Sequence, residues 1–177
     1  MNVKILSIVS LILLFSLSGT KVAEGQVTEN RIPDQVEAQI FDPQAQVLAD
    51  YLKKYDSPLQ YHAQDFIDAA RIYDLDWKLV PAIAGVESTF GKAIPGGYNA
   101  WGWGVYGNQA VYFRSWKEGI FVISEGLRVG YLNKGLKDPY SMNRVYAASS
   151  AWGGNVTYFM RDLEKFAQKV AVVSLGN

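Results

Sequence analysis

The sequence predicts a mostly helical domain with a small glycine- and aromatic-rich insert. Apolar residues recur at helical spacing through most of the chain after residue 42, and residues that favour helix starts precede these stretches. The segment 91–114 lacks this spacing and is rich in glycine and aromatic side chains, which is typical of a loop or a short hairpin. At 177 residues, 49% of them hydrophobic, the chain is long enough for one domain with a buried core.

Proline-marked starts predict the first three helices. Asp42-Pro43 combines a capping carboxylate with proline at the first helical position, and Ser57-Pro58 repeats that signal. A third helix is predicted near 77–90, with Pro81 in its first turn because proline deeper inside would break the helix. The apolar stripes of these three helices are Val47, Leu48, Tyr51, Leu52 and Tyr55; Phe66, Ala69, Ala70 and Tyr73; and Leu79, Val80, Ile83, Val86 and Phe90.

Two more helices are predicted after the insert. Ser115 and Glu118 have the spacing of a capping box, in which each side chain binds the backbone N–H of the other residue. Asn155 is expected to cap the last helix. The inward-facing residues are Trp116, Ile120, Ile123, Leu127 and Tyr131 in the first of these helices and Val156, Phe159, Met160, Leu163 and Phe166 in the second.

The first 41 residues are expected to lie outside the domain. Residues 1–19 resemble a secretory signal peptide, with Lys4 before an apolar run and small residues at the end of that run. The apolar run is short for a membrane span, so cleavage is favoured over retention as an anchor. Residues 20–41 are polar and lack a sustained period, which indicates a linker or mobile arm before a domain at 42–177. The protein is therefore expected in the cell envelope, periplasmic or extracellular.

The composition excludes several classes of protein. The 17 basic and 17 acidic residues cancel, which argues against a protein that grips nucleic acid. The chain has no cysteine and one histidine, so disulfides, thiolate metal sites and histidine-rich zinc sites are excluded. No metal and no cofactor is expected, and the domain is expected to act as a monomer without stable membrane insertion unless the signal is retained.

One carboxylate, Glu87, lies on the wrong face of the third predicted helix. At about 100° per residue it falls about 40° from Ile83, on or beside the buried face. A carboxyl group there loses hydration, which raises its pKa and suits a general acid. The competing interpretation is structural: a buried partner such as Arg114 could neutralise Glu87 in an ordinary ion pair.

The insert concentrates aromatic residues after Glu87. Seven aromatics fall within the 19 residues from Tyr98 to Trp116, against 14% of the whole chain. Because helical spacing does not explain those among the glycines, we expect them to line a cleft rather than fill the core, and indole and phenol rings suit the faces and hydroxyls of sugars. The glycine pattern at 102–107 formally matches a dinucleotide fingerprint, but no strand–helix context surrounds it, so nucleotide binding is discounted.

Three segments together resemble one known family. Residues 79–92, LVPAIAGVESTFGK, resemble the catalytic helix of the lysozyme-like superfamily, which includes soluble lytic transglycosylases and bacterial endo-β-N-acetylglucosaminidases. Residues 98–104, YNAWGWG, and 113–116, FRSW, resemble glucosaminidase segments that follow this helix. The resemblance covers about residues 60–168 and implies an α+β lysozyme-like fold. The Gly-Leu-Met-Gln segment of the transglycosylases is absent, so the choice between the two families stays open.

The resemblance implies a glycosidase with Glu87 as its general acid. Between Asp76 and Glu118 the sequence holds no other acidic residue, whereas two-carboxylate glycosidases need a partner within roughly 5–9.5 Å. A single-glutamate mechanism is therefore expected, in which an acetamido group, a hydroxyl group or water quenches the cation. The family also implies a tyrosine near the cleaved bond, for which Tyr146 is the first candidate and Tyr98 the second.

The expected substrate is the peptidoglycan glycan strand, cut at β-1,4 bonds between N-acetylated amino sugars. Which bond is cut, and whether by hydrolysis or by formation of an anhydro end, is left open. The competing function is a catalytically silent glycan-binding module, and a helical protein-interaction domain would leave the aromatic insert unexplained. The expected substrate-binding residues are Ser88, Asn99, Trp101, Trp103, Tyr106 and Trp152, with Trp116 as a further subsite wall that could instead belong to the core.

Overall fold

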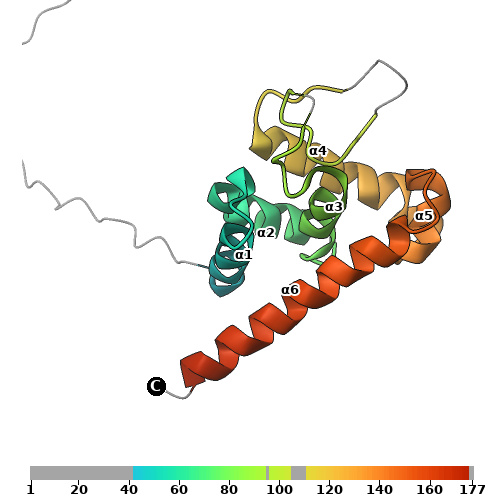
Figure 1. Cartoon of the computed structure of the whole chain (residues 1–177). Coiled ribbons are helices and arrows are strands. Elements are labelled where there is room, and N and C mark those ends of the chain that lie inside the picture. Colours follow the sequence, from blue (N-terminus) through green and yellow to red (C-terminus); the bar gives the residue numbers. More distant parts are fainter. Residues whose placement is uncertain (1–41, 95, 105–110, 176–177) are drawn as a thin grey trace, which may run out of the picture. The chain divides into compact units, whose positions relative to one another are not determined.

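The computed structural model describes residues 42–94, 96–104 and 111–175 (Figure 1). The predicted signal peptide at 1–19 and the arm at 20–41 lie outside the described residues. Within the described parts the chain is mostly helical, as predicted, and contains no β-strand. The insert is a loop in its described portions, so the hairpin alternative finds no support there. None of the described helices has both the length and the apolar character needed to cross a membrane.

Six α-helices and two short 3-10 helices, η1 and η2, make up the described fold (Figure 1). The longest, α6, packs against α1, α3 and α5, while α2 packs against α1 and α4. In chain order the elements are α1 (Pro43–Lys53), η1 (Pro58–His62), α2 (Ala63–Ile72), α3 (Leu79–Ser88), α4 (Trp116–Gly130), η2 (Leu132–Lys134), α5 (Pro139–Tyr146) and α6 (Trp152–Leu175).

The predicted helix starts before α1 and α2 are confirmed. The Asp42 carboxylate accepts a hydrogen bond from the backbone N–H of Gln44 at 2.9 Å, which satisfies one of the free donors of the first turn. Ser57 Oγ accepts from the N–H of Leu59 at 3.1 Å and donates to the carbonyl oxygen of Phe90 at 2.7 Å. The second start therefore opens η1, which leads directly into α2, and also ties this turn to the end of α3.

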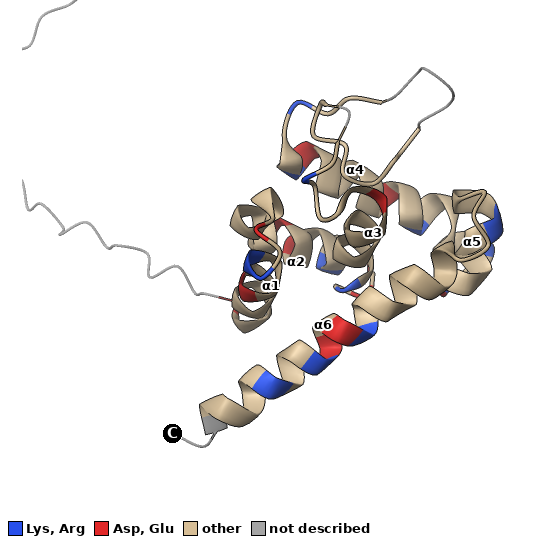
Figure 2. Ribbon diagram, viewed as in Figure 1, with Lys and Arg blue, Asp and Glu red and all other residues tan. Residues whose placement is uncertain are grey.

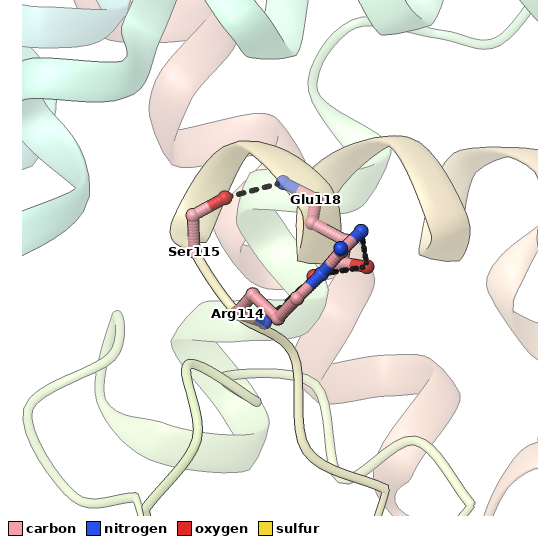
Figure 3. A network of polar contacts seen from close by, with 3 residues as sticks. All are labelled: Arg114, Ser115 and Glu118. Atoms are coloured by element: carbon pink, nitrogen blue, oxygen red, sulfur yellow. Dashed lines mark hydrogen bonds and ion pairs between the residues drawn. The ribbon is translucent and has the colours of Figure 1, made fainter.

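The start of α4 is close to the predicted capping box but differs in one bond (Figure 3). Ser115 Oγ accepts from the N–H of Glu118 at 3.1 Å, as expected. The Glu118 carboxylate accepts from the backbone N–H of Arg114 at 2.6 Å rather than from Ser115, and it also binds the Arg114 guanidinium at 2.8 Å. These bonds lower the pKa of Glu118. Because Arg114 is paired with Glu118, it does not neutralise Glu87, so Arg114 is wrong as the buried partner of that carboxylate.

The predicted cap of the last helix, Asn155, is wrong by four residues, because Ala151 precedes the first helical residue. α6 begins at Trp152, and the N–H of Asn155 already donates to the carbonyl oxygen of Ala151 at 3.0 Å. The N–H of Gly153, in the first turn, donates instead to Asn143 Oδ1 of α5 at 2.8 Å. A side chain from another helix thus satisfies this first-turn donor, and a local sequence pattern cannot show such a partner.

Helix α5 was not predicted, although its start carries a known signal. Asp138-Pro139 repeats the arrangement at the start of α1, and the Asp138 carboxylate accepts from the N–H groups of Tyr140 and Ser141 at 2.9 and 3.0 Å. The Ser141 hydroxyl in turn bonds the N–H of Asp138 at 3.2 Å, which completes a reciprocal capping box. Only eight residues follow, too few for a clear apolar period.

The central element of the core is α3, which is buried on almost every side. Eight of its ten residues are buried, and only Val86 and Glu87 are partly exposed. A helix this apolar has no polar face on which a carboxylate could be hydrated freely. The position of Glu87 at the carboxyl end of α3 is therefore what gives this side chain any access to solvent.

Candidate active site

Helix α3 ends at Ser88, one residue after Glu87, and an unusual turn follows. Thr89, Phe90 and Gly91 all have positive φ angles, of 53°, 58° and 82°. A β-branched residue such as threonine pays a conformational cost in this region, so surrounding contacts must hold it there. Two such contacts are the bond from the N–H of Gly91 to Ser88 Oγ at 2.8 Å and the bond from Ser57 to the Phe90 carbonyl. The turn directs the chain from α3 into the insert.

The Glu87 carboxyl group is half-buried and touches two other segments. Its Oε1 accepts a hydrogen bond from the indole Nε1–H of Trp152, at the start of α6, at 2.6 Å. Its Oε2 lies against Gly102, where a Cβ atom, if that residue had one, would be only 2.9 Å away. Burial raises the pKa of Glu87, and the Trp152 hydrogen bond opposes part of that rise. The predicted placement of this side chain, partly desolvated beside the aromatic insert, is confirmed.

The surroundings of Glu87 carry no compensating cation. Among the described residues, no lysine, arginine or histidine forms an ion pair with it. The first nine residues of α6 are uncharged, as are residues 98–104 of the insert, which we call the Trp101 loop. Figure 2 shows the beginning of α6 without charged side chains and the charged residues gathered farther along that helix. A neutral setting favours the protonated carboxyl group.

Aromatic rings form a continuous cluster behind Glu87. The ring of Tyr146, the last residue of α5, stacks on Trp152 with 4.4 Å between centroids and 19° between planes. Trp103 and Tyr131 each contact Tyr146 at 5.9 Å between centroids. Burial, and then the negative charge of Glu87, hold the pKa of Tyr146 well above its usual value. Tyr146 is therefore a neutral phenol that donates its hydrogen bond to the carbonyl oxygen of Trp101 at 2.8 Å.

The two tyrosine candidates differ in position. Tyr146 belongs to the aromatic cluster and reaches Glu87 through Trp152. Tyr98 is 43% exposed and packs edge-on against Trp116 at 5.2 Å. Tyr146, the first candidate, therefore lies in the same cluster as Glu87. Tyr98, the second candidate, packs instead against α4.

Asn99 organises the Trp101 loop from inside. Its side-chain nitrogen donates to the carbonyl oxygens of Trp103 and Val111 at 2.8 and 2.9 Å. Its side-chain oxygen accepts from the N–H groups of Trp101 and Trp103. With the side chain buried and fully used in this way, the prediction that Asn99 binds substrate directly is wrong. Asn99 holds the loop shape instead.

Two predicted sugar platforms are buried in the core. Trp101 is fully buried, and its Nε1–H donates to the carbonyl oxygen of Val80 in α3 at 3.1 Å. Trp152 is 3% exposed, and its polar atom is used on Glu87. Neither ring has a free face for a sugar, so both assignments as subsite walls are wrong. The loop approaches α4 so closely that a Cβ atom at Gly119 would lie 2.7 Å from the Trp101 ring, which explains the burial.

The other aromatic residues predicted to bind sugar differ in how far they are exposed. Trp103 is partly exposed and lies over Gly126 of α4, where a Cβ atom would collide with the indole ring. Trp116 is partly buried against the core, in agreement with the alternative stated for it. Tyr106 lies outside the described residues. Trp103 is therefore the predicted platform in the Trp101 loop that keeps an accessible surface.

Ser88 is a structural residue rather than a substrate contact. Its hydroxyl is buried and within 2.7 Å of the Ala100 carbonyl oxygen and 3.0 Å of the Ala84 carbonyl oxygen, and it accepts from the N–H of Gly91. The prediction that Ser88 binds substrate is wrong because the side chain is 4% exposed and its one hydroxyl hydrogen is directed to backbone carbonyl oxygens. Its bond to Ala100 attaches the Trp101 loop to the end of α3, next to Glu87.

Ser88→Ala should lower the free energy of unfolding by about 1–3 kcal/mol, because the buried Gly91 N–H and Ala100 carbonyl lose their partner. Urea denaturation would measure this. Ser174→Ala is the matched control, since Ser174 makes the same bond to the carbonyl four residues earlier but on the exposed part of α6. Equal, small losses in both variants would contradict a structural role for Ser88.

The raised pKa of Glu87 predicts a pH-dependent loss of stability. A carboxyl group whose pKa is higher in the folded state binds its proton more tightly there, so its contribution is present at low pH and is lost as the pH rises through the folded-state pKa. Glu87→Gln keeps a neutral side chain of similar shape and should abolish this loss. Urea denaturation of both proteins over a pH series should show wild type weakening relative to the variant as the pH rises. Parallel curves would contradict the prediction.

Sequence patterns did not indicate the roles of two members of the site, since Trp152 was expected to bind sugar rather than Glu87. The Trp152–Glu87 hydrogen bond joins residues that are 65 positions apart, and Gly102 was singled out only as part of a glycine-rich stretch. Among the described residues no group of three or more metal-binding side chains occurs. Comparison with models of known protein families and with curated proteins finds no match.

Proposed function

We propose that the protein is a glycosidase of lysozyme-like fold that cleaves β-1,4 bonds between N-acetylated amino sugars in peptidoglycan. The observation that carries the proposal is the setting of Glu87: a half-buried carboxyl group with a raised pKa, no ion-pair partner among the described residues, and one oxygen beside an exposed glycine. A raised pKa favours the protonated carboxyl group, which is the form that general-acid catalysis at a glycosidic oxygen requires.

In the proposed reaction Glu87 transfers its proton to the glycosidic oxygen as the bond from that oxygen to the anomeric carbon breaks. The bonding electron pair stays with the leaving oxygen, and positive charge develops on the sugar ring. Either water or a hydroxyl group of the same sugar then adds to the anomeric carbon and returns a proton to the Glu87 carboxylate. Between cleavage of the bond and this addition, the acetamido oxygen of the substrate can stabilise the positive charge on the sugar ring. No second carboxylate is needed in this scheme.

The available acids support a single-glutamate mechanism. Glu118 is held by Arg114 at the start of α4. Glu125 is exposed, and the raised pKa of Glu87 has no contribution from another carboxylate. A like charge close by would raise the pKa of Glu87 further.

The substrate and the location follow from the family resemblance and the signal-like N-terminus. Endo-β-N-acetylglucosaminidases and lytic transglycosylases act on peptidoglycan, and a leader at 1–19 would deliver the chain to the cell envelope. The partly exposed Trp103 supports sugar binding because an indole face suits the apolar face of a pyranose ring.

Incubation of the purified chain with purified peptidoglycan tests the proposal. Soluble fragments should appear, and mass spectrometry would identify both the cut bond and any anhydro end. Binding to the polymer without release of fragments would favour the silent glycan-binding module. Absence of both binding and release would overturn the proposal altogether.

A further inference from the structure

The hydrogen bond from Trp152 to Glu87 distinguishes the two carboxyl oxygens of the acid. An indole N–H can only donate, so Oε1 is the acceptor in this bond. A protonated carboxyl group has one carbonyl oxygen and one hydroxyl oxygen, and the carbonyl oxygen is the better acceptor. The acidic hydrogen therefore belongs on Oε2, which lies against the exposed Gly102. Gly102 has a positive φ of 60° and no side chain, which allows Oε2 to lie this close to the loop backbone.

A closed circuit of contacts keeps the Trp152 indole in place. The ring stacks on Tyr146, the Tyr146 hydroxyl donates to the Trp101 carbonyl oxygen, and the Trp101 indole donates to the Val80 carbonyl oxygen. Val80 belongs to α3, the helix that also carries Glu87, so the circuit begins and ends on one helix. The start of α6 is fixed further because the N–H of Gly153 binds Asn143.

We propose that Trp152 is a positioning residue that fixes Glu87 through Oε1 and leaves Oε2 as the oxygen that delivers the proton. This inference rests on the proposed function. This role replaces the predicted role of Trp152 as a sugar platform. The indole N–H binds Oε1, whereas Gly102 of the Trp101 loop lies against Oε2. Trp152 therefore acts through Glu87 and is not a catalytic residue itself.

The first test needs no change at Trp152 and no enzymatic activity. In wild-type protein the NMR signal of the Trp152 indole N–H should move with pH, at the same midpoint as the side-chain carboxyl signal of Glu87 in glutamate-labelled protein. In Glu87→Gln the pH-dependent movement of the indole signal should vanish. An indole signal that ignores the ionisation of Glu87, or that moves equally in both proteins, would overturn the proposal.

The second test is Trp152→Phe, which keeps an aromatic ring to stack on Tyr146 but removes the donor. We expect the pKa of Glu87 to rise in the NMR titration, because the lost bond favours the charged form. We expect kcat to fall by up to about a hundredfold because the acid is no longer held in one orientation. KM should change little, and the alkaline limb of the pH–rate profile should move to higher pH.

Trp77→Phe is the matched control, since Trp77 precedes α3 at the end remote from Glu87. It should leave the titration of Glu87 and the pH–rate profile unchanged. A Trp152→Phe protein that is merely less stable, with both readouts unmoved, would overturn the positioning role. A higher KM with an unmoved profile would do the same and would restore the sugar-platform assignment.

The tests separate this inference from the proposed function. If the chain releases no fragments from peptidoglycan, the two NMR titrations still decide whether Trp152 controls Glu87. If Glu87→Gln abolishes fragment release but Trp152→Phe moves neither the titration nor the profile, the glycosidase stands and the positioning role falls.

Discussion

Replacing Glu87 with glutamine is expected to lower the rate of fragment release from peptidoglycan by about a hundred- to ten-thousand-fold, the usual contribution of a general acid. Glutamine preserves the size of the side chain and can still accept the Trp152 hydrogen bond, but it has no acidic proton to give. The loss should fall on kcat rather than on affinity for the polymer. Mass spectrometry of the soluble fragments, with sedimentation of bound protein as the affinity measure, would separate these two quantities.

Glu125→Gln is the control for the Glu87 variant. Glu125 lies exposed on α4, and the structure records no bond from its side chain to another described residue. Its replacement makes the same Glu-to-Gln change at an exposed position and should leave fragment release close to that of wild type. Equal release by wild type and Glu87→Gln would remove Glu87 as the acid, whereas a loss in both variants would point to a two-carboxylate mechanism.

The second large effect is expected from Trp101→Ala, which should lower the free energy of unfolding by about 3–5 kcal/mol. The Trp101 ring is fully buried and contacts Phe66 and Phe113, so its removal leaves a large cavity between the loop and the helices. The substitution also leaves the Val80 carbonyl oxygen without the indole donor. Urea denaturation monitored by circular dichroism would measure the change in midpoint.

Tyr61→Ala provides the comparison for Trp101→Ala. Tyr61 is 83% exposed in η1, so removal of its ring should change the free energy of unfolding by no more than about 0.5 kcal/mol. If Trp101→Ala is as stable as Tyr61→Ala but binds glycan less well, the ring is a sugar platform and the buried position assigned to it is wrong.

Helix starts were predictable where the capping group lies next to the residues that it caps. Asp42 and Ser57 bind backbone N–H groups two residues ahead, and Ser115 binds one three residues ahead. The same signal occurs at Asp138, but the eight-residue helix behind it is too short to show an apolar period. The start of α6 was not predictable in this way, since Asn143 on another helix supplies a partner for its first turn.

The candidate acid was predictable because a single helix decides its environment. The apolar residues around the α3 helix leave no hydrated face for Glu87, and this follows from 3.6-residue periodicity alone. The roles of the neighbouring aromatics were not predictable. Trp101 and Trp103 are two residues apart in the same loop, yet one is fully buried and the other keeps an exposed surface. Each ring packs against a glycine of α4, Trp101 on Gly119 and Trp103 on Gly126, and the loop sequence does not show these contacts.

The sequence by itself determined that this chain is mostly helical and that a desolvated glutamate ends its most apolar helix, because both depend on interactions between residues close together in the chain. Only the tertiary structure decided which residues serve that glutamate. The partner of Oε1 comes from the start of α6, the glycine beside Oε2 comes from the loop, and the ring that supports the partner comes from α5. Contacts over such separations are set by how the helices pack, and no local pattern encodes them.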